Sequence, residues 1–118
     1  MSLEDNRREY QYGRLASDSL HSSPFEQFNV WMEQAVASSL SDPTAMCLAT
    51  VDEDGKPWQR TVLLKGFDVK GFMFYTNLGS RKAHHIAENP NVSLIFPWMR
   101  LDRQVIIGGK AENCLLYT

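Results

Sequence analysis

The sequence has few of the features that mark secreted and membrane proteins. Its 118 residues contain only two cysteines, Cys47 and Cys114, too few for a disulfide framework. Cys47 lies in the apolar run 45–49, which predicts a buried and unreactive thiol. No apolar run approaches the roughly 20 residues of a membrane span, and residues 1–14 lack the apolar core of a signal peptide. We therefore expect a cytoplasmic protein with no membrane partner.

The chain also lacks a charge excess and the motifs of several functional classes. Its formal net charge of -2 argues against a nucleic-acid partner, because such proteins usually carry a strong basic excess. It has no phosphate loop, dinucleotide fingerprint, nucleophile elbow or metal-binding motif. His84 and His85 are adjacent in a predicted helix, where neighbouring side chains point about 100° apart. We expect an exposed pair here and no metal site.

The first clear structural signal is the start of a helix at residue 23. Ser23 is a good N-cap, Pro24 suits the first helical position, and Glu26 completes a capping box. Residues 41–43, Ser-Asp-Pro, are expected to end this helix. Helical spacing predicts a core-facing stripe, with Trp31 beside it, made of Phe25, Phe28, Met32, Ala35 and Val36.

The rest of the chain is strand-like, with one short helix at residues 81–89. The pair Asp54-Gly55 is a strong hairpin signal, and a second turn falls within residues 66–71. Tight turns favour antiparallel pairing, so we expect one small β-barrel domain at 23–112 with helices packed outside it. A flexible arm, 1–22, is expected before it and a tail, 113–118, after it. The predicted strands are 46–51, 58–65, 72–76, 92–96 and 103–108.

One segment suggests a phosphate site on physical grounds. Gly79-Ser80-Arg81-Lys82 places a capping hydroxyl and two cations at a helix start, where free amides and the helix dipole favour an anion. Arg81 and Lys82 oppose that dipole, and a bound anion would remove the conflict. A solvated basic turn explains the same residues.

A second segment, Arg60-Thr61-Val62-Leu63-Leu64-Lys65, carries a cation at each end of an apolar strand. It fits an elongated ligand that is anionic at one end, or simply a strand with charged ends. Strand alternation puts Arg60 and Lys65 on opposite faces unless the strand twists or bulges.

Several linked motifs resemble the pyridoxamine 5'-phosphate oxidase family over roughly residues 7–112. Arg7-Arg8-Glu9-Tyr10 resembles the family's N-terminal arm. The other motifs follow in family order: Asp42-Pro43-Thr44-Ala45-Met46, Ala49-Thr50-Val51-Asp52, Gly55-x-Pro57, Gln59-Arg60-x-Val62-Leu63-Leu64-Lys65, Phe74-Tyr75-Thr76-Asn77-x-Gly79-Ser80-Arg81-Lys82-Ala83, Asn89-Pro90, Phe96-Pro97-Trp98 and Arg103-Gln104-Val105.

The resemblance implies a mainly β, antiparallel split β-barrel of Greek-key type that binds FMN at a homodimer interface. It also implies an oxidoreductase of pyridoxal phosphate biosynthesis. Such an enzyme oxidises pyridoxamine or pyridoxine 5'-phosphate to pyridoxal 5'-phosphate, with dioxygen as acceptor. In such enzymes the flavin performs the redox step and the protein orients it, so no residue is assigned as a catalytic acid or base.

The resemblance also assigns binding roles by position. Lys65 would face the substrate phosphate as well as FMN, and Arg7 and Tyr10 match arm positions that close over the substrate. The FMN contacts implied are Arg60, Thr61, Val62, Leu63, Leu64, Lys65, Tyr75, Thr76, Arg81, Lys82 and Gln104.

The sequence departs from the family pattern after Glu112. Members continue with a further helix and a long C-terminal half, which would supply most substrate-phosphate contacts; here residues 113–118 show no family pattern. Three functions stay open: an active FMN-dependent oxidase, a truncated FMN-binding module with little or no oxidase activity, and a structural remnant that dimerises and binds nothing.

Overall fold

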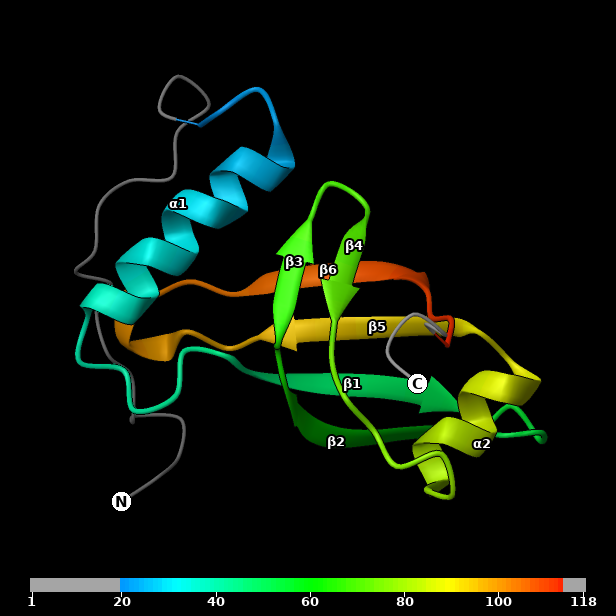
Figure 1. The fold of residues 1–118 in the computed structure, drawn as a ribbon. Coiled ribbons are helices and arrows are strands. Elements are labelled where there is room, and N and C mark those ends of the chain that lie inside the picture. The colour runs from blue at the N-terminus through cyan, green and yellow to red at the C-terminus, as the bar shows by residue number, and fades with distance from the viewer. Residues whose placement is uncertain (1–19, 114–118) are drawn as a thin grey trace, which may run out of the picture.

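The structure is a computed structural model that describes residues 20–113, and in this part the chain forms two α-helices, six strands and one short 3-10 helix (Figure 1). Their order is α1 (Pro24–Ala37), β1 (Ala45–Val51), β2 (Pro57–Leu63), β3 (Gly66–Asp68), β4 (Gly71–Met73), α2 (Arg81–Glu88), β5 (Asn91–Phe96), η3 (Met99–Leu101) and β6 (Val105–Lys110).

The main layer is a four-stranded antiparallel sheet in the order β2-β1-β5-β6. Strands β3 and β4 pair only with each other and form a separate short hairpin. Alternation along β1 buries Met46, Leu48 and Thr50 and leaves the residues between them half-buried. In Figure 1, α1 and α2 lie near opposite ends of the sheet, with the β3–β4 hairpin between them.

An aromatic cluster joins α1, the β3–β4 hairpin and the sheet. The Phe28 ring contacts Phe67 and Phe72 of the hairpin edge to face, with centroids 4.9 and 5.1 Å away. It also contacts Phe96 and Trp98 on the β5 side, at 5.3 and 5.7 Å. Edge-to-face pairs stabilise beyond their buried area, so this one side chain contributes to the packing of three elements.

Two local sequence signals are confirmed. The Ser23 hydroxyl accepts a hydrogen bond from the Glu26 amide at the start of α1. The β1–β2 turn contains Asp54-Gly55, and Gly55 has φ +81°, a conformation that glycine adopts without steric cost. Asp52 fixes this turn, because its Oδ1 accepts the amides of Asp54 and Lys56 at 2.9 Å each.

The first helix differs from its prediction in length and in buried face. It ends at Ala37, before the expected stop at 41–43, because the Ser38 hydroxyl donates to the Ala35 carbonyl and competes with helical bonding. The stripe is narrower than expected: Phe25 and Val36 are exposed, whereas the other members are buried.

Three predicted strands were wrong in extent. The expected strand 72–76 stops at Met73, because β4 belongs to the short hairpin and the chain then crosses to α2 without strand pairing (Figure 1). Strand β2 ends at Leu63, not at residue 65. Strand β6 starts two residues later than expected, at Val105, because η3 and a left-handed Asp102 (φ 54°) occupy the preceding turn.

The prediction of a buried Cys47 was also wrong. This thiol is half-buried, since β1 alternation directs it away from Met46 and Leu48 to the opposite face of the sheet. Its Sγ lies 3.8 Å from Oε1 of Gln59 on the neighbouring strand.

Candidate phosphate and flavin site

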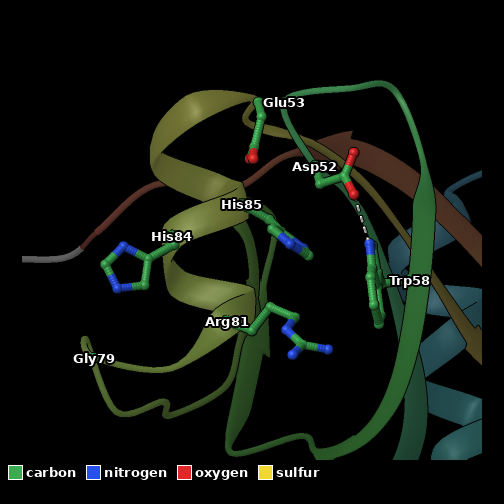
Figure 2. A pocket seen from close by; sticks show the side chains of 7 residues that line it. All are labelled: Asp52, Glu53, Trp58, Gly79, Arg81, His84 and His85. Carbon is green, nitrogen blue, oxygen red and sulfur yellow. Dashed lines mark hydrogen bonds between the residues drawn. The ribbon is translucent and has the colours of Figure 1, made fainter.

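A shallow hollow lies where the start of β2 meets α2 (Figure 2). The β1–β2 turn forms one wall and α2 forms the other. Trp58 and Arg81 point toward each other across it, from β2 and α2 respectively (Figure 2). Its lining residues are Asp52, Glu53, Trp58, Gly79, Arg81, His84 and His85.

Arg60 lies beside this hollow and is fixed by the strand next to it. Its Nη1 donates to the Leu48 carbonyl at 3.1 Å and to Oγ1 of the fully buried Thr50 at 2.7 Å. Partial burial, followed by the nearby charge of Arg81, lowers the pKa of Arg60. An arginine pKa lies so far above neutrality that the guanidinium stays charged.

The prediction that both histidines of the pair are exposed was wrong for His85. His84 is exposed, but His85 is buried, with 6% of its surface accessible. Its Nδ1 is hydrogen-bonded at 2.8 Å to the Thr50 hydroxyl, which also accepts from Arg60. Arg60, Thr50 and His85 thus form one hydrogen-bonded chain.

The indole ring of Trp58 packs against the guanidinium of Arg81. Its Nε1 donates to Oδ2 of Asp52 at 2.9 Å, and the Cζ atom of Arg81 lies 4.4 Å from its ring centroid. The Trp58 hydrogen bond and then the Lys56 amide lower the pKa of Asp52, because both favour the ionised carboxylate. The β1–β2 turn therefore orients a ring on which a guanidinium stacks.

The N-terminus of α2 presents free donors beside these arginines. Ser80 caps the helix by accepting the Ala83 amide at 3.3 Å, and its hydroxyl lies 3.2 Å from that of Thr76. The amides of Arg81 and Lys82 precede the first intrahelical bond and have no partner within the helix. In the part of the chain that the structure describes, Arg60, Arg81 and Lys82 form no salt bridge with a carboxylate.

This donor set fits a phosphate group. Arg60 and Arg81 repel each other, and Arg81 and Lys82 oppose the helix dipole. A dianion between them would neutralise both conflicts and accept charge-assisted hydrogen bonds. We call the group Arg60, Arg81 and Lys82, with Thr76 and Ser80, the phosphate corner.

The remaining residues of the run 60–65 divide by strand alternation, as expected. Val62 and Leu64 are buried on the inner side, at 8% and 6% exposure, and the half-buried Arg60 lies on the same side. Thr61, Leu63 and Lys65 are exposed on the other side. Any FMN contact of Val62 or Leu64 is therefore made by backbone atoms, because both side chains belong to the core.

The other predicted site residues lie apart from the phosphate corner or outside the described residues. Tyr75 is exposed on the segment between β4 and α2. Gln104 is exposed just before β6, at the end of the sheet where Val105 pairs with Phe96. Arg7 and Tyr10 fall outside residues 20–113, so their assignment stays a prediction.

The chain matches a known protein family. The model of a family described as "Pyridoxamine 5'-phosphate oxidase" matches residues 32–114, more than half of the chain. The chain belongs to the pyridoxamine 5'-phosphate oxidase family.

Curated relatives in this family are similar along nearly the whole chain. A pyridoxine/pyridoxamine 5'-phosphate oxidase of Serratia proteamaculans is 61% identical over 111 residues, covering 94% of this chain and 51% of its own length. The protein of that name from Vibrio cholerae is 60% identical over 113 residues, covering 96% and 54%. The chain thus spans about half the length of these relatives.

Solved structures confirm the predicted antiparallel split β-barrel with flanking helices. PhzG of Burkholderia lata, solved with tetrahydrophenazine-1-carboxylic acid, is 27% identical with a TM-score of 0.77, over 84% of this chain and 50% of its own. A pyridoxamine 5'-phosphate oxidase-related, FMN-binding protein of Nostoc punctiforme is 24% identical with a TM-score of 0.66, over 77% and 47%. The second likeness supports the fold alone.

Four residues around the phosphate corner of this oxidase-family chain were missed from sequence: Thr50, Asp52, Trp58 and His85. One signal was available, because the Asp54-Gly55 turn pairs Thr50 with Trp58 and brings Arg60 beside β1. His85 had no such signal, since its contact with Thr50 joins residues 35 positions apart.

Residues 20–113 contain no group of three His, Cys, Asp or Glu side chains that could hold a metal ion. None of their helices combines the length and apolar character needed to cross a bilayer.

Proposed function

We propose that this chain binds FMN and holds its phosphate at the phosphate corner. The observation that carries the proposal is that Arg60 lies close enough to Arg81 to interact with its charge at the start of α2, where Lys82 follows in sequence. None of the three has a carboxylate salt bridge among the described residues. Arg60 is fixed by Leu48 and Thr50, so its guanidinium needs little reorganisation when an anion arrives.

The rest of the flavin would extend along the β2 end and the segment before α2. The backbone of residues 61–64 and the side chains of Lys65, Tyr75 and Thr76 would contribute there, and Gln104 would complete the set. The amide of Lys65 donates to the Met73 carbonyl at 2.8 Å, which joins the end of β2 to the end of β4. This bond brings Lys65 toward the segment that carries Tyr75.

A homodimer with FMN at its interface is part of the same proposal. The outer face of the four-stranded sheet is partly apolar and exposed, with Leu63 39% and Ile106 63% accessible. No helix or strand of residues 20–113 buries this face, whereas the inner face forms the core. A second copy of the chain would cover it and bring the outward residues of β2 to a shared boundary.

The proposed reaction is the oxidation of pyridoxamine or pyridoxine 5'-phosphate to pyridoxal 5'-phosphate, in the cytoplasm. When bound, FMN supplies the two-electron redox chemistry, with dioxygen as acceptor. Lys65 is exposed and cationic, and would attract the substrate phosphate. Arg7 and Tyr10 would close over the substrate.

A second candidate is an FMN-binding module with little or no oxidase activity. The chain spans about half the length of each curated relative. The two candidates share the phosphate corner and differ only in turnover.

Three measurements on the purified chain test these proposals. We expect yellow protein that binds added FMN, and a dimer mass in sedimentation equilibrium. Reduction of dioxygen to hydrogen peroxide when pyridoxine 5'-phosphate is added supports the oxidase, and bound flavin without turnover supports the module. A chain that takes up no FMN contradicts both.

A further inference from the structure

Three factors favour movement of the Arg81 side chain away from the phosphate corner when no ligand is bound. It is exposed and has several rotatable bonds. It lies at the first position of α2, where the helix dipole repels a cation. It also lies near the fixed charge of Arg60. A residue that binds FMN in this position needs a separate contact that holds it.

The Trp58 ring supplies that contact. A guanidinium that stacks on a ring through its flat face keeps its in-plane N–H donors available for an anion. The Cζ atom of Arg81 lies 4.4 Å from the ring centroid, and its guanidinium donates no hydrogen bond to another residue within 20–113. Its donors therefore stay available while its position is restricted.

The ring itself is held by the β1–β2 turn. Asp52 accepts the Trp58 indole N–H through one carboxylate oxygen and two turn amides through the other. Figure 2 shows the carboxylate above the ring and Arg81 on its α2 side. The turn, the carboxylate, the ring and the guanidinium form one chain of contacts that ends at the phosphate corner.

We propose that Trp58 is a positioning residue for phosphate binding, which holds Arg81 in place and is itself oriented by Asp52. The proposal rests on the proposed FMN function. It assigns no contact between Trp58 and the flavin. Loss of the ring should therefore affect only ligands that carry the phosphate.

The test compares FMN and riboflavin, which differ only in the phosphate, by fluorescence titration of the purified full chain. For Trp58→Leu we expect FMN affinity to fall roughly two- to fivefold, the range for loss of an exposed cation–π contact. Riboflavin affinity should stay unchanged, which also shows that the variant is folded. Asp52→Asn should produce a smaller loss of the same kind.

A double-mutant cycle separates positioning from a general structural effect. In an Arg81→Ala background, Trp58→Leu should weaken FMN no further, because the residue that it positions is gone. Trp31→Leu is the matched control, since Arg103 stacks on Trp31 at 4.7 Å in the same way. This control should leave the FMN-to-riboflavin ratio unchanged.

The contrary outcomes are distinct. Unchanged FMN affinity in Trp58→Leu, equal losses for both ligands, or a full additional loss in the Arg81→Ala background would overturn the positioning role alone. An unmodified chain that binds no FMN would contradict both this role and the proposed function.

Discussion

At the scale of single residues, the phosphate corner depends on buried polar groups that have hydrogen-bond partners. Thr50 is fully buried, yet it accepts from Arg60 and reaches Nδ1 of His85. Among the described residues, no buried side-chain nitrogen or oxygen lacks a hydrogen-bond partner. A buried polar chain of this kind stabilises a structure only while every member is paired.

Replacement of Thr50 with valine tests that chain. Thr50→Val keeps the side-chain shape but leaves Nδ1 of His85 without its partner and Arg60 with one acceptor fewer. We expect the free energy of unfolding, measured in urea, to fall by about 1–3 kcal/mol, which is the cost of leaving a buried polar group without a hydrogen bond. Tryptophan fluorescence would report the transition.

The control for this change is Thr61→Val on the exposed side of β2. Its free energy of unfolding should stay within about 0.5 kcal/mol of the unmodified chain. Equal losses for the two threonine variants would show that the Thr50 hydroxyl has no special role.

At the scale of elements, the aromatic cluster decides where the β3–β4 hairpin lies. The hairpin has three residues in each strand and no pairing with the main sheet, so it depends on side-chain packing. Phe28 provides that packing through its contacts with Phe67 and Phe72. The position of Lys65 and Tyr75 therefore depends on α1.

We expect Phe28→Ala to destabilise the chain by about 3–5 kcal/mol, because it opens a cavity among several buried rings. Thermal or urea unfolding would measure the loss. Phe25→Ala is the matched control on the same helix, since Phe25 is 38% exposed and should cost less than about 1 kcal/mol. A loss below 1 kcal/mol for Phe28→Ala would contradict the assigned packing role.

Local signals predicted the elements well and their contacts poorly. Ser23, Ser80 and the Asp54-Gly55 turn act within a few residues, so capping and turn rules located them. Residues 72–76 were predicted as one strand because they are aromatic, but ring contacts with Phe28 hold the hairpin off the main sheet. Capping and turn rules cover only a few neighbouring residues, so they do not predict how the hairpin packs against Phe28.

The same limit applies to the candidate site. Arg60, Arg81 and Lys82 were named from sequence, since each is a cation in a distinctive motif. Burial of His85 depends on Thr50, a residue distant in sequence. The stack of Arg81 on Trp58 likewise joins α2 to β2, with strands β3 and β4 between them in the chain.

At the scale of the whole molecule, the two faces of the sheet have different roles. The inner face carries the core and, at its α2 end, the phosphate corner. The outer face presents Leu63, Thr61 and Ile106 to solvent. The proposed dimer assigns both faces a function, one for binding the cofactor phosphate and one for contact with a second copy.

The central claim is that the phosphate corner binds the phosphate of FMN, and a comparison of two ligands tests it most directly. The measurement is the affinity of Arg81→Ala with Lys82→Ala for FMN and for riboflavin. Lys70→Ala with Arg100→Ala, which removes two exposed cations elsewhere, is the charge-matched control.

We predict that the Arg81 and Lys82 double variant binds FMN roughly a hundredfold more weakly, since two charge-assisted contacts are lost. Its riboflavin affinity should stay within about threefold of the unmodified chain, and the control should retain both affinities. Equal weakening of FMN and riboflavin, or FMN binding as tight as in the unmodified chain, would contradict the account.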